Sequence, residues 1–225
     1  MKFEDILWYQ PAYILLKGLE AEKYYQGKKM PTDIRKAIEE TRLGAIWVFG
    51  LNKLNNQELY LQPVNEQDPD IRLLFESKSS KSKKYPLWGH WVDVEITRYE
   101  EHRSEPLEVF IKEGKLKKVY ERDTIVLAVI DKTITKGKPW KEISSELQKN
   151  KYPYDIFLMG RTEPIKTVYA IARVYPIFDS VLRYDLHDEA AKSYKVKQGI
   201  KIVNKQGNIF NKTVPRGFNP FMDTL

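Results

Sequence analysis

The chain contains no cysteine among its 225 residues. This absence excludes disulfide bridges, zinc sites built from cysteine, and a cysteine nucleophile. A long apolar run is also missing, because the stretch 6–16 is interrupted by Gln10 and Pro11 and is too short to cross a bilayer. The opening residues 1–5 are partly acidic, where a secretion signal is basic. We therefore expect a cytoplasmic protein with no membrane partner.

Several motifs of common enzymes are absent as well. The sequence has no P-loop and no Gly-x-Gly-x-x-Gly segment, which argues against a bound nucleotide cofactor. It has no Gly-x-Ser-x-Gly elbow of a serine hydrolase. The three histidines, His90, His102 and His187, do not have the spacing of metal ligands.

The composition is that of a globular protein with a basic surplus. Hydrophobic residues make up 42% and charged residues 31% of the chain, which excludes a disordered polymer. Its 38 basic and 31 acidic residues give a net charge of +7. Such a surplus suits a polyanionic partner without requiring one. The length allows one sizeable domain, or one domain with an appendage.

The hydrophobic pattern predicts an α/β or α+β fold with a mixed central sheet flanked by helices. A helix is expected from Pro31 onward, with Thr32 or Asp33 as its N-cap and Gly44 as a weak point. Further helices are expected from Pro106, around 140–147, and over 178–195. Strands are expected at 59–61, 71–75, 91–99, 124–130, 154–159 and 167–174.

Apart from Thr124, the run 124–130 is continuously apolar, which is typical of a strand buried on both faces. The tail carries turn residues between 200–203 and 209–210, which favours a hairpin. Three segments are expected: an N-terminal segment 1–30, a core 31–180, and a basic, β-rich C-terminal extension 181–225.

Two short acidic segments form the most informative pattern. Asp70 follows Pro69 at the start of one expected strand, and Glu95 lies inside another, beside Thr97. If these strands pair as antiparallel neighbours, the two carboxylates approach each other on one face of the sheet. Carboxylates so placed repel unless a cation lies between them, and hard oxygens select Mg²⁺ or Mn²⁺. Such an ion can activate water against a phosphodiester.

This layout resembles the PD-(D/E)xK nuclease superfamily, whose fold is called restriction-endonuclease-like. The resemblance covers residues 31–131 and rests on the order of the elements around Pro69-Asp70 and Glu95-Ile96-Thr97. It implies that Asp70 and Glu95 are metal ligands. Thr97 stands where the family usually has a lysine; its hydroxyl can bond water but supplies no charge. A lysine borrowed from elsewhere in the chain is one way to restore that charge.

Other residues near this pattern leave alternatives open. Glu76-Ser77-Lys78 has the literal Glu-x-Lys spacing, but it lies too close to Asp70 for the chain to return. A helical glutamate often joins such sites, and the choice between Glu39 and Glu40 stays open. Four lysines of the polar segment 77–84 are expected to contact nucleic-acid phosphates, unless that segment is only a solvated loop. They are Lys78, Lys81, Lys83 and Lys84.

Our first hypothesis is therefore a Mg²⁺-dependent endonuclease acting on DNA, with Asp70 and Glu95 as ligands and Thr97 as an auxiliary. At this length a free-standing restriction enzyme is the natural setting, as a homodimer in which two sites cut two strands. The second hypothesis is a non-catalytic nucleic-acid-binding protein on a related fold. A third is an interaction protein whose basic surface serves solubility, which predicts no salt-dependent DNA binding.

Overall fold

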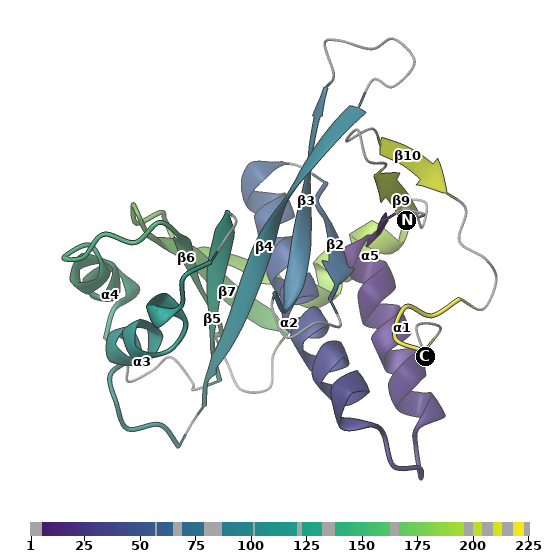
Figure 1. Ribbon diagram of the computed structural model, residues 1–225, viewed down its shortest axis with the longest axis horizontal. Helices are drawn as coiled ribbons and strands as arrows, with labels where there is room; N and C mark the ends of the chain where they lie inside the picture. Colours follow the sequence, from purple (N-terminus) through teal and green to yellow (C-terminus); the bar gives the residue numbers. More distant parts are fainter. Residues whose placement is uncertain are drawn as a thin grey trace. The chain divides into compact units, whose positions relative to one another are not determined.

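A computed structural model gives the fold of the chain. The structure describes residues 6–56, 58–64, 69–78, 87–100, 102–120, 123–131, 138–162, 167–195, 200–203, 209–212 and 218–222. These residues form a mixed α/β fold with a mixed sheet and flanking helices, as the sequence predicts (Figure 1). Within the described part of the chain, no helix is both long and apolar enough to cross a membrane.

Contacts divide the chain into two compact units. The first unit consists of Met1–Val92 and Ala190–Leu225, and the second of Asp93–Glu189. Strand β4 (Leu87–Tyr99) begins in the first unit and ends in the second. The segment boundaries expected from the sequence, at 30/31 and 180/181, stay a prediction.

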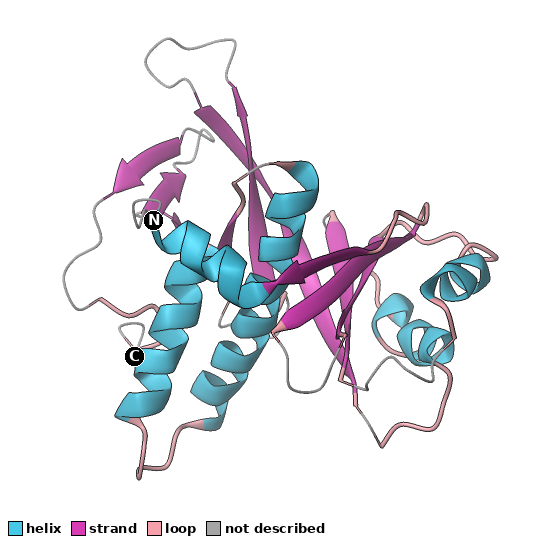
Figure 2. Cartoon of the chain, turned by 180° about the vertical axis from the view of Figure 1, so that it is seen from behind, coloured by secondary structure: helices cyan, strands magenta, loops and turns pink. Residues whose placement is uncertain are grey.

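In the first unit the strands are antiparallel neighbours in the order β10-β9-β1-β2-β3. Their bounds are β1 (Ile6–Tyr9), β2 (Tyr60–Pro63), β3 (Ile71–Lys78), β9 (Ile200–Val203) and β10 (Ile209–Lys212). The helices α1 (Pro11–Tyr24) and α2 (Thr32–Asn55) pack against each other, and α2 also packs on β2 and β3 (Figure 2). The hairpin expected in the tail is confirmed, since β9 and β10 pair with each other.

Two details of the helices differ from the prediction. Helix α2 begins at Thr32, but Pro31 holds the N-cap position and no side chain caps it, so the expected cap by Thr32 or Asp33 is wrong. The sequence predicted no element before residue 31, whereas the structure has β1 and α1 there. Strand β1 is only four residues long and its partner β9 lies far along the chain, so local periodicity gave no signal for it.

Gly44 has a packing role that its low helix propensity conceals. A Cβ atom at this position of α2 would collide with the Cδ1 atom of Ile71, which is fully buried on β3. Glycine therefore allows the helix to approach the strand closely.

In the second unit, β4 pairs in parallel with β5 (Thr124–Ile130), and β5 pairs in parallel with β6 (Asp155–Arg161). Strands β7 (Val168–Tyr175) and β8 (Leu182–Asp185) continue the sheet in antiparallel order. Every residue of β5 is buried, which confirms the strand predicted from its continuous apolar run. The helix expected over 178–195 is wrong in its first part, because β8 pairs with β7 and only α5 (Leu186–Lys195) is helical.

The helices α3 (Leu107–Glu113) and α4 (Trp140–Leu147) follow β4 and β5, with the short 3-10 helix η1 (Lys115–Lys117) directly after α3. Alternate side chains of the strands form one core cluster with these helices, including Val126 of β5, Ile111 of α3 and Ile143 of α4. This core fixes the strand face on which the candidate site lies.

Candidate functional site

Glu95 lies in the middle of β4, in the second unit. In the parallel register it is opposite Val126, whose side chain belongs to the core cluster with α3 and α4. Paired neighbours point to the same face, so Glu95 lies on the face that these helices cover. It is only 1% exposed. A carboxylate buried to this degree is costly unless a cation or several donors compensate its charge.

Lys115 is a partner of this carboxylate. Its ammonium Nζ donates a hydrogen bond to Oε2 of Glu95 and forms an ion pair with it. The Lys115 side chain is 19% exposed, against 1% for that of Glu95, so the pair reaches toward the surface at its lysine end. The structure thus joins a buried anion of β4 to a cation 20 residues later in the chain.

The backbone around Lys115 is fixed by two tyrosines. The Oη of Tyr120 donates a hydrogen bond to the carbonyl of Lys115 at 3.0 Å, and the Oη of Tyr154 donates to the carbonyl of Lys118 at 2.9 Å. The two rings meet edge to face, with centroids 4.9 Å apart. Gly114 ends α3 immediately before Lys115. These contacts hold η1 in place and restrict where the Lys115 side chain can reach.

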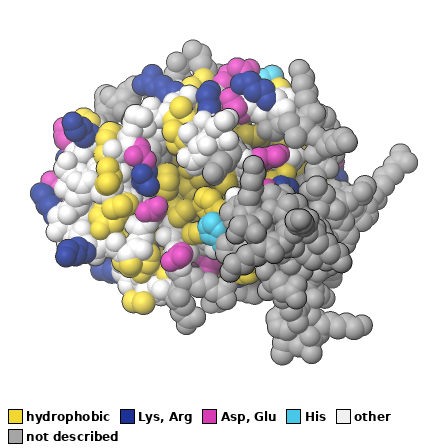
Figure 3. All heavy atoms as spheres, turned by 90° about the horizontal axis from the view of Figure 1, so that it is seen from above, with side chains coloured by type: hydrophobic (Ala, Val, Ile, Leu, Met, Phe, Trp, Pro, Cys, Tyr) yellow, Lys and Arg dark blue, Asp and Glu magenta, His cyan; other side chains and the backbone are white. Residues whose placement is uncertain are grey.

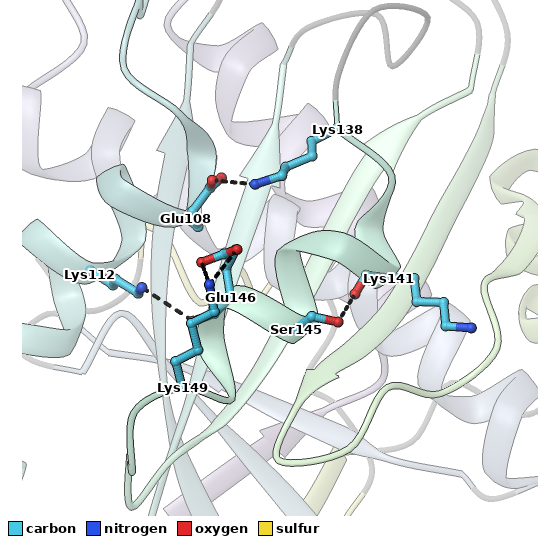
Figure 4. Close-up of polar contacts among 7 residues, drawn as sticks. All are labelled: Glu108, Lys112, Lys138, Lys141, Ser145, Glu146 and Lys149. Atoms are coloured by element: carbon cyan, nitrogen blue, oxygen red, sulfur yellow. Dashed lines mark hydrogen bonds and ion pairs between the residues drawn. The ribbon is translucent and has the colours of Figure 1, made fainter.

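Further polar contacts join α3 to the segment around α4 (Figure 4). Lys138 forms an ion pair with Glu108 of α3 at 3.0 Å, and this hydrogen bond raises the pKa of the lysine. Lys112 donates to the backbone carbonyl of Glu146 at 3.3 Å. Glu146 itself pairs with Lys149, which lowers the pKa of the glutamate. The contacts of Glu108 with Lys138 and of Lys112 with Glu146, together with the apolar core, hold α3 against the segment around α4.

Thr97 lies two residues after Glu95 on the same face of β4. It is opposite Ala128 in the register with β5 and is half-buried. The structure therefore brings Thr97 and Glu95 onto one strand face, as the alternation predicts. A hydroxyl at this place can hold a water molecule beside the carboxylate.

Asp70 lies directly before β3 in the first unit and is 5% exposed. Its position at the start of the strand is as predicted. Asp70 and Glu95 belong to different units, and their expected approach stays a prediction. The two glutamates left open both lie on α2, where Glu40 forms an ion pair with Lys36 at 3.4 Å. The choice between Glu39 and Glu40 stays open.

Of the four lysines expected to contact phosphates, Lys78 is the last residue of β3. Lys81, Lys83 and Lys84 lie outside the described residues. On the face drawn in Figure 3, the basic and acidic side chains are interspersed instead of being gathered by sign. The described part of that face therefore has no patch of one sign of charge that would attract a polyanion.

The donor set limits which ion fits. Among the described residues, no group of three or more His, Asp or Glu side chains is placed to hold a metal ion. Mg²⁺ does not require such a cage, because proteins often bind it through one or two carboxylates, with water and substrate phosphates completing its shell. Glu95 offers one carboxylate of this kind, but its Oε2 is already paired with the ammonium of Lys115.

Lys115 is the residue that the sequence did not identify. The sequence indicated only that a lysine from elsewhere in the chain can replace the one missing at the position of Thr97. The sequence did contain a signal for the end of the helix after β4, because Gly114 is a common helix-ending residue, and Lys115 follows it directly. Helical periodicity cannot select Lys115 over Lys112, Lys117 or Lys118, because the choice depends on how α3 packs on the sheet.

No protein-family model, no curated protein and no solved structure matches this chain.

Proposed function

We propose that the protein is a divalent-metal-dependent nuclease that hydrolyses phosphodiester bonds in DNA, with Glu95 as a metal ligand. One observation carries the proposal: a carboxylate 1% exposed, in the middle of a strand, held against a cation on the helix-covered face. A soluble fold has little structural need for a charge at such a place, because a hydrophobic pair of similar volume is often at least as stable. Buried charges of this kind are frequent at functional sites.

The order of the elements supports the same proposal. Helix α2, the hairpin β2–β3, strand β4, helix α3 and the buried strand β5 follow one another as in the restriction-endonuclease-like core. The parallel pairing of β4 with β5 across α3 fits that core as well. Asp70, at the start of β3, is proposed as the second ligand on the sequence pattern.

In the proposed reaction a water molecule gives up one proton as its oxygen bonds to phosphorus, the ester P–O bond breaks, and the leaving oxygen takes up one proton. A bound Mg²⁺ or Mn²⁺ ion would supply the Lewis acid that lowers the pKa of water and neutralises charge on the phosphate. Glu95 would hold that ion through its carboxylate. Thr97 would orient a water molecule through its hydroxyl. A homodimer would place two such sites on two strands.

The test is cleavage of plasmid DNA with Mg²⁺ or Mn²⁺. We expect wild-type protein to cut, and Glu95→Gln and Asp70→Asn each to lower the rate by at least about 100-fold, in line with loss of a group that holds a catalytic metal. Glu113→Gln and Asp33→Asn are matched controls, because both residues are exposed. They should cut as the wild type does.

Cutting that survives Glu95→Gln in a folded protein would remove the proposed site. Tight, salt-sensitive DNA binding without any cutting would instead support a non-catalytic nucleic-acid-binding protein.

A further inference from the structure

We infer that strand β8 is the surface through which two copies of this chain pair, edge to edge, around a two-fold axis. The pairing involves an edge of the second unit and no residue of the Glu95 site, so it does not depend on the proposed function. β8 is the last strand of the sheet, and no described strand pairs with its outer edge. It contains no proline and pairs with β7 in continuous register, so it lacks two features that commonly protect an open edge.

Alternate residues of β8 direct their backbone groups to this open edge. Directly after the strand, the N–H of Leu186 donates to the carbonyl of Thr167 at 2.9 Å and so continues the ladder with β7. In an antiparallel ladder, successive residues direct their N–H and C=O groups alternately to one side and the other. Leu186 and Tyr184 therefore point toward β7, whereas Arg183 and Asp185 point toward the open edge.

The direction of these groups limits the register of two paired copies. An outward-pointing residue has to lie opposite another outward-pointing residue if the two are to exchange hydrogen bonds. The registers centred on β8 that satisfy this condition place Arg183 opposite itself, Asp185 opposite itself, or Arg183 opposite Asp185 of the other copy. The first two bring like charges directly opposite each other, which is destabilising. Only the third places opposite charges together, and two-fold symmetry makes that pair occur twice.

Both charges are available for such a pair. Arg183 is exposed and forms no ion pair with a described residue. The carboxylate of Asp185 accepts hydrogen bonds from Thr167 and from the backbone of His187, but no lysine or arginine of the described chain pairs with it. Val181, directly before the strand, is 43% exposed and adds apolar area to the same surface. A second copy therefore fits this edge in both charge and hydrogen bonding.

The first measurement is sedimentation equilibrium of the wild type at concentrations up to about 100 µM, because a short strand pair belongs to the weak end of specific association. The key variant is Arg183→Asp, which brings two carboxylates together at each of the two places. The matched control is Lys151→Asp, which makes the same change of charge at another exposed cation of the second unit. Arg183→Lys keeps the charge, and circular dichroism checks the fold of each variant.

We expect the wild type to dimerise in this range, and Arg183→Asp to raise the dissociation constant at least about tenfold, because like charges replace opposite ones across the interface. Lys151→Asp and Arg183→Lys should stay within a few-fold of the wild type. A wild type that remains monomeric would overturn the inference. Dimerisation of folded Arg183→Asp as strong as that of the wild type would overturn it as well.

Introduced cysteines test the register, because the chain has none of its own. Arg183→Cys and Asp185→Cys proteins are mixed and oxidised with copper phenanthroline. In the inferred register the two new thiols lie opposite each other, about 5.5 Å apart between Cα atoms, and the mixed dimer keeps one Arg183–Asp185 pair. Identical variants place their thiols diagonally, about 7–8 Å apart, which is beyond ordinary disulfide geometry. Disulfide-linked dimers should therefore form in the mixture; equal linking in Arg183→Cys alone would refute this register.

Discussion

At the scale of single residues, neighbouring side chains and backbone groups determine how the charge of a carboxylate is stabilised. Glu95 is the clearest case, since its carboxylate is buried and its charge is paired with the ammonium of Lys115. Asp185 is a second case, at the surface end of β8. The Oγ1 of Thr167 donates to its Oδ1 at 2.5 Å, and the backbone N–H of His187 donates to the same oxygen at 2.9 Å.

These two bonds give a prediction about acid titration. The hydrogen bond from Thr167, followed by that from the His187 backbone, lowers the pKa of Asp185 below its ordinary value. A group whose pKa is lower in the folded state contributes stability above its unfolded pKa, and this is lost as the pH falls through the folded pKa. We expect Thr167→Val to raise the pKa of Asp185. The free energy of unfolding of this variant should then fall less than that of the wild type as the pH is lowered.

Carboxyl titration by NMR measures this shift. Asp155 is an internal control, because burial raises its pKa and Thr167 is not among the causes of that shift. An Asp185 pKa that does not move in Thr167→Val would contradict the assignment of the hydrogen bond.

At the scale of elements, close packing of helices on strands takes precedence over local propensity. Helix α2 tolerates Gly44 in its interior, although alanine is preferred to glycine in a helix by about 1 kcal/mol. The reason lies on the neighbouring strand, where Ile71 occupies the space that a side chain at position 44 would need. Helix α3 is a second example, since it ends at Gly114 and Lys115 follows directly.

Gly44→Ala is therefore expected to destabilise the first unit by about 1 kcal/mol, because overpacking costs about 1–3 kcal/mol and outweighs the gain in helix propensity. Ile71→Val removes the Cδ1 atom that the new methyl group would meet. The double variant should lose less stability than the sum of the two single variants. Urea denaturation of all four proteins measures this coupling. Stabilisation by Gly44→Ala alone would show that the strand yields and that the close approach does not matter.

At the scale of the whole molecule, segments far apart in the sequence meet within the first unit. Strand β9 pairs with β1, and Asn219 donates through its Nδ2 to the carbonyl of Lys17 in α1 at 3.0 Å. Lys201 of β9 is 8% exposed, pairs with Glu76 of β3, and lies 4.1 Å from the ring centroid of Tyr60. This buried cation attaches the C-terminal hairpin to strands β1 to β3, which precede it in the chain.

Lys201→Met should destabilise the first unit by about 3 kcal/mol, because it leaves the carboxylate of Glu76 largely buried without its cation. Adding Glu76→Gln should restore part of this loss, since both charges are then removed. Urea unfolding followed by tryptophan fluorescence is the measurement, to which the buried Trp8 of the first unit contributes. Lys29→Met is the control, because Lys29 is exposed. Equal losses in Lys201→Met and Lys29→Met would show that the pair contributes nothing.

The sequence determined the elements whose information is local. The apolar run of β5, the alternation that places Glu95 and Thr97 on one face, and the start of α2 near Pro31 could all be predicted. They follow from side-chain periodicity, which acts over a few residues. The mixed α/β class follows from their order.

Only the tertiary structure decided the partners of these elements. It paired β1 with a strand almost 200 residues later and placed Ile71 where a side chain at position 44 would lie. It also brought Lys115, one of several lysines, to Glu95. Such choices depend on distances between segments that are remote in the chain. A sequence pattern specifies which face a residue occupies, whereas packing determines what that residue meets there.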